Sequence, residues 1–109
     1  MACLFCRIIA GEIPSTPVHR DDQVYAFRDI NPQAPFHVLL VPCRHISTLN
    51  DLAPEDDELA GALLRRAAAI AKAHGYGERG YRTVFNCNAD AGQSVDHVHL
   101  HLLAGRRLS

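Results

Sequence analysis

Residues 92–103 read GQSVDHVHLHLL, and the second half of this stretch decides the fold that we expect. From residue 97 onward, three histidines alternate with apolar side chains. Successive side chains of a β-strand point to opposite faces, so alternate residues share a face. The pattern therefore predicts a strand over His97–Leu103 that turns three imidazoles to one side and its apolar side chains toward the core.

Three imidazoles in register leave three interpretations open. They are exposed residues of a surface strand, ligands of a catalytic metal, or groups that bind and attack a phosphate. The loop that runs into the strand favours the third interpretation. There, Gly92 lets a phosphate approach the backbone closely, and the hydroxyl of Ser94 lies near backbone N–H groups that can form an anion-binding nest.

The rest of the chain supplies the other elements of one sheet. Apolar spacing and turn residues predict a short helix at 3–11, strands at 18–20, 24–27 and 37–41, a long helix that starts near Pro54 and has His74 in its last turn, and a strand at 81–86. Connections this short favour antiparallel pairing. We therefore expect an α+β fold: a five-stranded antiparallel sheet with one long and one short helix.

Composition and charge describe an ordinary small globular chain. The 109 residues are 48% hydrophobic and 21% charged, with a formal net charge of -1. This balance argues against a nucleic acid or a membrane as the main partner. The N-terminus lacks a signal-peptide pattern, and the longest strongly apolar run, residues 38–41, is too short to span a bilayer. We therefore expect a cytoplasmic protein.

Cys3 and Cys6 form a C-x-x-C pair near the N-terminus. Such a pair is a redox motif, two free thiols, or half of a four-ligand metal site. A thioredoxin-like redox site needs the pair between a strand and a helix of a parallel sheet, and the sequence does not predict that arrangement. Cys43 and Cys87 have no motif partner, and we expect them to be ordinary thiols.

The stretch 92–103 closely resembles the signature of the histidine triad (HIT) family, and it is most similar to the Hint branch, the histidine triad nucleotide-binding proteins. Three further blocks match the same family, at residues 5–14, 26–35 and 41–46. The resemblance thus covers nearly the whole chain. It implies a HIT-like fold in a single domain over residues 1–109.

In this family the middle histidine of the triad is the nucleophile, which implies that role for His99. One ring nitrogen must be unprotonated and aimed at phosphorus, while the other donates to a backbone carbonyl beside the first histidine. The resemblance implies that His101 donates to phosphate oxygens and that His37 supports the site. It implies that Asn86 reaches across the scissile linkage and that Ser94 donates to the leaving atom or to a phosphate oxygen.

The resemblance also implies a purine nucleotide as the ligand. The purine walls match Phe5, Ile8 and Phe27, although the spacing of these three residues alone favours plain core. Asp29 matches the acid that holds the ribose hydroxyls. The full set implied for the nucleotide comprises Phe5, Ile8, Phe27, Asp29, Ile30, Asn86, Gly92, Ser94, Val95, His99 and His101.

Some bacterial members of the family bind zinc with a similar N-terminal cysteine pair and two histidines. The matching residues here are Cys3, Cys6, His45 and His97. The resemblance therefore implies a closed structural zinc site that pins the N-terminal segment to the sheet. It implies no catalytic metal, because the histidines carry the reaction.

The implied activity is hydrolysis of nucleoside 5′-phosphoramidates, or of related adenylated or guanylated compounds. It proceeds through a nucleotidyl-histidine intermediate and releases a nucleoside monophosphate. The alternatives are a nucleotide-binding regulatory or scaffold protein with weak turnover, a dinucleoside polyphosphate hydrolase or transferase, and a metalloenzyme. The polyphosphate branches usually carry glutamine at the position of Asn86, which disfavours them.

The chain departs from the family pattern at two places. It contains no tryptophan and stops at Ser109, where better-studied Hint proteins continue with a tail that shapes the leaving-group side of the site across the dimer. We therefore expect an altered leaving-group preference. Asp96 stands where aromatic or apolar residues are common. The family is typically homodimeric, and the face of the long helix expected at that interface comprises Ala60, Leu64, Ala68 and Ala71.

Overall fold

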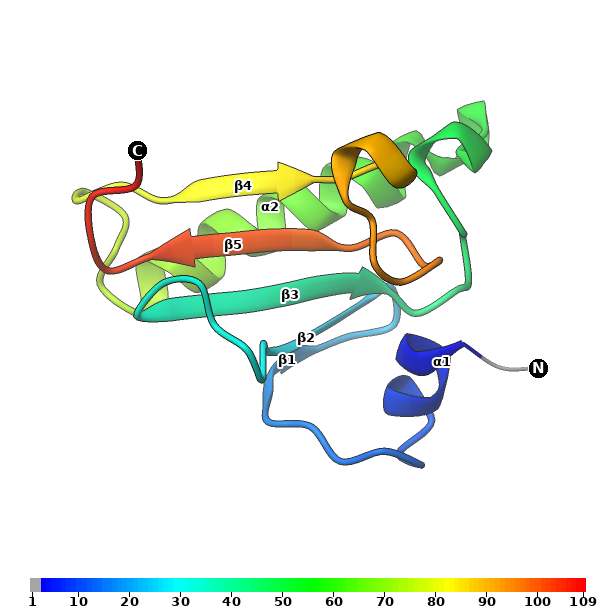
Figure 1. The fold of residues 1–109 in the computed structure, drawn as a ribbon, viewed down its shortest axis with the longest axis horizontal. Helices are drawn as coiled ribbons and strands as arrows, with labels where there is room; N and C mark the ends of the chain where they lie inside the picture. Colours follow the sequence, from blue (N-terminus) through cyan, green and yellow to red (C-terminus); the bar gives the residue numbers. More distant parts are fainter. Residues whose placement is uncertain (1–2) are drawn as a thin grey trace.

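The computed structural model describes residues 3–109 as one antiparallel sheet with a helix on each face (Figure 1). The elements follow one another as α1 (Leu4–Ile9), β1 (Pro17–Arg20), β2 (Val24–Arg28), β3 (Phe36–Pro42), the 3₁₀ turns η1 (Leu49–Asp51) and η2 (Pro54–Asp56), α2 (Asp57–Ala73), β4 (Arg82–Phe85), the 3₁₀ turn η3 (Ala89–Ala91) and β5 (Leu100–Ala104). The strand order is β1-β2-β3-β5-β4. The expected α+β fold, with five antiparallel strands, one long helix and one short helix, is confirmed.

The strand β3 runs through the centre of the sheet and is buried along its whole length. Its even-numbered side chains pack against α2, whereas Leu39 and Val41 pack on the opposite face with Phe5 of α1. Because alternate residues share a face, His37 joins the α1 side. In the register with β5, Leu39 lies opposite His101, so both strands present imidazoles to this same face.

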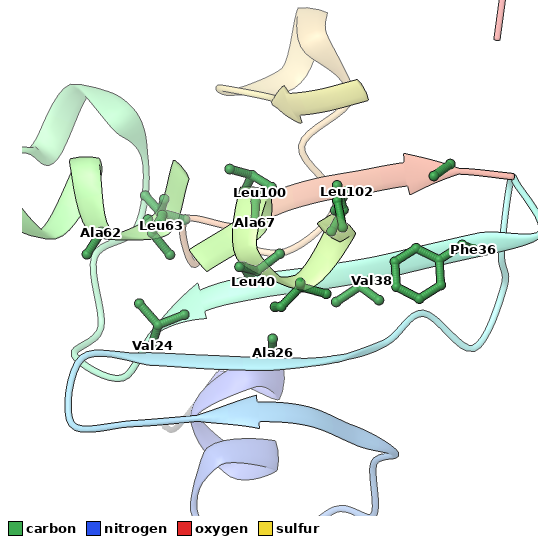
Figure 2. Close-up of a cluster of buried hydrophobic side chains, with 14 of the residues drawn as sticks. Val24, Ala26, Phe36, Val38, Leu40, Ala62, Leu63, Ala67, Leu100 and Leu102 are labelled. Atoms are coloured by element: carbon green, nitrogen blue, oxygen red, sulfur yellow. The ribbon is translucent and has the colours of Figure 1, made fainter. Parts of the chain in front are cut away.

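The larger core lies between the sheet and α2, which runs behind the strands in Figure 1. Leu40, Leu100 and Leu102 are fully buried there, as Figure 2 shows. Leu63, Ala67 and Ile70 of α2 all enter this core. Burial of this apolar area is the main term that holds α2 on the sheet.

The long helix differs from the prediction at both the start and the expected interface face. Pro54 opens the 3₁₀ turn η2, and the α-helix itself begins at Asp57. Ala71 was expected at a dimer interface, but it is 0% exposed and packs in the core of its own chain. Leu64 is 48% exposed and remains available on the outer side of the helix.

The histidine strand is shorter than predicted, because β5 begins at Leu100. Residues 97–99 precede it and leave the ladder with β3. The ring Nε2 of His97 lies 2.9 Å from the carbonyl oxygen of Pro42, and Pro42 has no N–H to donate. The N–H of Val98 donates instead to the carbonyl of Ile46, at 2.7 Å. No helix among residues 3–109 is long and apolar enough to cross a membrane.

Candidate active site

A cavity of about 280 Å³ opens on the α1 face of the sheet. Its walls come from α1, the segment 13–15 and the residues around the end of β2. Its floor includes Leu39 of β3, and His99 and His101 complete the polar side. The cavity therefore lies where the triad residues meet the short N-terminal helix.

His99 is fixed in one tautomer by the backbone. Its Nδ1 lies 2.7 Å from the carbonyl oxygen of His97, and a carbonyl only accepts, so Nδ1 carries the hydrogen. The other ring nitrogen, Nε2, then has a free lone pair. His99 is 5% exposed, and the ring of Phe5 meets it edge-on with 5.0 Å between centroids. A buried, oriented imidazole with a free lone pair can act as a nucleophile.

A second chain of hydrogen bonds fixes His101 in the opposite role. The backbone N–H of Gln33 donates to Nδ1 of His37 at 3.0 Å, so His37 carries its hydrogen on Nε2. That Nε2 lies 2.9 Å from Nδ1 of His101 and donates to it. The hydrogen of His101 therefore sits on Nε2, which makes the ring a donor on the cavity side.

Burial keeps these two rings neutral near pH 7. Desolvation, followed by the neighbouring His99 and His37, lowers the pKa of His101 to about 4. Desolvation also lowers the pKa of His37, although the carboxylate of Asp29 opposes that shift. The Oδ2 atom of Asp29 lies 3.4 Å from Nε2 of His37. The cavity thus holds one imidazole acceptor, His99, beside one imidazole donor, His101.

The C-terminal segment supports the loop that begins this relay. A guanidinium nitrogen of Arg106 donates to the carbonyl of Gln33 at 2.9 Å. Gly105 packs on Pro35 so closely that a Cβ atom would lie 2.8 Å from the Pro35 ring, and its φ of +103° also favours glycine. The sequence did not identify Gln33, Gly105 or Arg106, because Gln33 acts through its backbone and the other two act through packing and a main-chain contact.

The expected purine and ribose residues gather around the cavity. Phe5, Ile8 and Phe27 all line it, and Phe5 and Phe27 are at the same time buried in the core on this face. Phe5 and Phe27 are therefore core residues, as their spacing favours, and they also form part of the cavity wall. Asp29 lines the cavity and accepts from the N–H of Asn31 at 2.8 Å, and Ile30 stands at the rim with 88% of its surface exposed.

The loop before the histidines is only partly at the cavity. Ser94 and Val95 line it, whereas Gly92 and Asn86 are not among the lining residues of the part of the chain described here. Gly92 ends the turn η3 with a φ of +81°. The side chain of Gln93 binds the backbone of the loop itself and the carbonyl of Ser47, at 2.8 Å. These bonds hold the start of the loop toward residue 47.

The first histidine of the triad belongs to a separate cluster with both N-terminal thiols. The Nδ1 atom of His97 lies 3.3 Å from the Sγ of Cys3 and 3.6 Å from the Sγ of Cys6. The Nδ1 atom of His45 lies 3.5 Å and 3.4 Å from the same two sulfurs. All four ligand atoms thus lie within 4.8 Å of one another, which makes this cluster able to bind a metal.

The protonation of the two imidazoles also suits a cation. His97 donates from Nε2 to the carbonyl of Pro42, so its Nδ1 has a lone pair. The Nε2 of His45 lies 3.1 Å from the hydroxyl of Ser47, and its Nδ1 lies only 3.3 Å from that of His97. Burial and the neighbouring Cys3 raise the pKa of Cys6, and a bound cation would favour its thiolate form.

Two of the interpretations of the triad are therefore not supported. His97 and His99 are 0% and 5% exposed, so a row of exposed strand residues is wrong. The three rings also do not converge on one metal, because His97 faces the thiols and His101 faces His37. The remaining interpretation is a pair of imidazoles, His99 and His101, that face a common ligand cavity.

Comparison with known proteins agrees with this geometry. A family model described as the HIT domain matches residues 10–108, and the chain belongs to the HIT family. It is 49% identical over 105 residues to the purine nucleoside phosphoramidase of Escherichia coli K12, covering 96% of this chain and 88% of that protein. The two are therefore similar over nearly their whole lengths.

Solved structures resemble the chain equally closely. A HIT family hydrolase from Legionella pneumophila superposes with a TM-score of 0.97 at 53% identity, covering 99% of this chain and 96% of the other. A histidine triad nucleotide-binding protein from Candida albicans gives a TM-score of 0.84 at 36% identity, covering 93% and 73%. The expected membership of the HIT family, with Hint-like neighbours, is confirmed.

Proposed function

We propose that this chain is a nucleotide hydrolase that cleaves purine nucleoside 5′-phosphoramidates, or related adenylated or guanylated compounds, and releases the nucleoside monophosphate. The observation that carries the proposal is the 2.7 Å contact between Nδ1 of His99 and the carbonyl of His97, which leaves Nε2 free as a nucleophile. The similarity to an E. coli purine nucleoside phosphoramidase supports the same reaction class.

The proposed reaction has two displacement steps. The Nε2 lone pair of His99 attacks phosphorus, the phosphorus–nitrogen bond breaks, and the leaving amine takes a proton from the hydroxyl of Ser94, which regains one from solvent. A water molecule then attacks phosphorus and loses one proton to solvent, the bond to Nε2 breaks, and the electron pair returns to the ring. The Nε2–H of His101 donates to the phosphate oxygens as their charge grows, which stabilises both transition states. His37 keeps that donor in place.

The nucleotide takes the cavity in this proposal. The purine packs between Phe5, Ile8 and Phe27, beside Ile30, and the ribose hydroxyls donate to Asp29. Gly92 and Val95 approach the phosphate. Asn86 follows β4 outside the cavity lining, so its proposed contact is with the leaving group beyond the scissile bond.

Zinc is the metal that we propose for the thiol cluster, held by Cys3, Cys6, His45 and His97. Zinc bonds of about 2.3 Å to sulfur and about 2.0 Å to nitrogen in a tetrahedron put S···N pairs about 3.5 Å apart and N···N pairs about 3.3 Å apart. The four S···N distances are 3.3, 3.4, 3.5 and 3.6 Å, and the N···N distance is 3.3 Å. Zinc bound there would supply folding energy to the N-terminal segment, and the proposed reaction needs no catalytic metal.

A homodimer and a cytoplasmic location are two further proposals. Leu64, with Ala60 and Ala68 beside it, supplies an outer face of α2 that suits a homodimer. A pair of reduced thiols ligating a metal suits the cytoplasm, where thiols are kept reduced.

The test is turnover of adenosine 5′-phosphoramidate by the wild type and by His99→Ala. We expect AMP release by the wild type and at least a roughly thousandfold loss in the variant, because the nucleophile itself is removed. AMP binding should persist in His99→Ala. A wild type that binds AMP without turning over substrate would favour the nucleotide-binding alternative, and equal turnover by both proteins would exclude His99 as the nucleophile.

A further inference from the structure

The helix α1 contributes to both the nucleotide cavity and the metal cluster. Its side chains Leu4, Phe5 and Ile8 form one wall of the cavity. Cys6 lies in the same helix, and Cys3 is its N-cap residue, whose Sγ accepts from the N–H of Cys6 at 3.2 Å. One short element thus carries both the apolar wall of the nucleotide cavity and half of the donors of the metal cluster.

This helix is too short to hold its position alone. It has six residues, and helices of that length are not stable in isolation. Phe5 is its one buried residue, and an exposed contact joins the carbonyl of Ile9 to Arg20 at 3.1 Å. Besides the apolar packing of Phe5, the thiols of Cys3 and Cys6 attach α1 to the sheet, because they meet two imidazoles from distant parts of the chain.

His97 connects the same cluster to the nucleophile. Its Nδ1 faces the two sulfurs, its Nε2 donates to Pro42, and its main-chain carbonyl accepts from Nδ1 of His99. The ring is 0% exposed and held from both sides. The position of that carbonyl, and with it the direction of the His99 ring, therefore depends on the packing of the His97 side chain.

We propose that the metal cluster Cys3, Cys6, His45 and His97 positions the nucleotide site. With metal bound, α1 stays docked and the cavity keeps its apolar wall, and the His97 carbonyl keeps the nucleophile aligned. Without metal, the Nδ1 atoms of His45 and His97, 3.3 Å apart, and the two sulfurs lose the cation between them, and α1 leaves the sheet with its cavity side chains. Nucleotide affinity then follows metal occupancy. The inference rests on the proposed nucleotide site.

The test compares Cys3→Ser/Cys6→Ser with Cys43→Ser/Cys87→Ser, a matched control that removes two thiols outside the cluster. The AMP dissociation constant is measured by calorimetry well below the unfolding temperature of each protein. Amide hydrogen exchange of residues 4–9 is followed in parallel. We expect the cluster variant to bind AMP roughly 10- to 100-fold more weakly, the effect of losing one apolar wall, with faster exchange over α1 and an intact sheet. The control should match the wild type.

A second comparison keeps the natural side chains, in case the cluster variant does not fold. Wild-type protein is stripped of metal with a chelator at neutral pH and then reloaded with zinc. We expect the AMP affinity to fall on stripping and to return with zinc but not with magnesium. If the metal were merely structural, stripping it would lower the unfolding temperature but leave the AMP dissociation constant within about twofold, and that result would overturn the proposal.

Different outcomes contradict the hydrolase activity and the positioning role of the metal. A wild type that binds AMP but does not hydrolyse the phosphoramidate contradicts the hydrolase and leaves the metal dependence of affinity fully measurable. An AMP affinity that is the same with and without zinc overturns the positioning role, whatever the turnover. A wild type that binds no AMP in either state overturns both.

Discussion

The Nε2 atom of His37 lies 2.9 Å from the Nδ1 atom of His101, and this contact decides which end of the second imidazole carries a hydrogen. Because Gln33 donates to the far side of His37, the direction of donation runs one way, from the loop through His37 to His101. His99 is fixed in the opposite sense by the carbonyl of His97. Two neighbouring imidazoles thereby present a lone pair and an N–H to the same cavity.

Replacing His37 should release the donor. In His37→Ala, His101 can exchange tautomers and loses its support, so we expect kcat to fall about tenfold or more with a smaller change in KM. His37→Gln keeps an N–H near His101 and should recover part of that loss. Steady-state kinetics on adenosine 5′-phosphoramidate measure both variants. A loss confined to KM would mean that His37 only shapes the binding cavity.

Stability should fall as the solution is acidified from about pH 6.5. The pKa of His101 is lowered to about 4 in the folded chain, below its ordinary value of 6.5, so the unfolded chain binds the proton more readily. The stabilising contribution is therefore complete above pH 6.5 and is lost as the pH falls toward 4. The lowered pKa of His37 acts in the same direction.

Urea unfolding at pH 7 and pH 5 measures this effect. We expect the wild type to lose roughly 1–2 kcal/mol from His101 between these conditions, and His101→Gln to lose less over the same interval. The difference between the two losses of unfolding free energy removes contributions from the other histidines, including those of the metal cluster. An identical loss of unfolding free energy in both proteins would show that the pKa of His101 is not lowered in the folded state.

Arg106 should affect catalysis without touching the substrate. It binds the carbonyl of Gln33, whose N–H begins the relay to His37 and His101. We expect Arg106→Ala to lower kcat about two- to fivefold, with partial recovery in Arg106→Lys, because the exposed hydrogen bond to the Gln33 carbonyl is lost. Arg107→Ala is the matched control, because the side chain of Arg107 makes no such bond within residues 3–109. Equal effects of both changes would indicate a general influence of charge.

Gly105→Ala tests the same support by packing. The new methyl group would lie 2.8 Å from the Pro35 ring, and alanine is strained at a φ of +103°. We expect a loss of about 1–3 kcal/mol in the free energy of unfolding. Thermal and urea denaturation measure it. A stability equal to that of the wild type would mean that the 29–35 loop adjusts freely, and the role given to the C-terminal segment would fail.

The sequence predicted the sheet because its signals were local. Alternation along residues 97–103 and along the apolar run of β3 follows directly from the two-residue period of a strand. The prediction overextended the histidine strand by three residues. A hydrogen bond between the His97 side chain and Pro42, 55 residues away, ends the ladder early, and no local pattern reports such a contact.

The site was predictable where side-chain type carries the chemistry and not where the backbone does. His99 and His101 line the cavity, His37 bonds to His101, and the four expected metal ligands lie within 4.8 Å of one another. Gln33 contributes a main-chain N–H and a main-chain carbonyl, which any residue except proline has, so its identity reveals nothing. Gly92 and Asn86 were assigned to the nucleotide from the family pattern, and neither is among the described residues that line the cavity. Gly92 instead ends the turn η3, in a loop that the side chain of Gln93 holds toward Ser47.

The outer face of α2 gives a last prediction, because two residues expected there have opposite surroundings. Leu64 is 48% exposed and Ala71 is 0% exposed. If α2 forms a homodimer, Leu64→Glu buries a charge at that interface and should yield a monomer with little loss of monomer stability. Ala71→Leu should instead overpack the core and cost about 1–3 kcal/mol in unfolding free energy, with the oligomeric state unchanged. Light scattering and urea unfolding separate the two effects. A Leu64→Glu protein that keeps the mass of the wild type would place any dimer contact elsewhere.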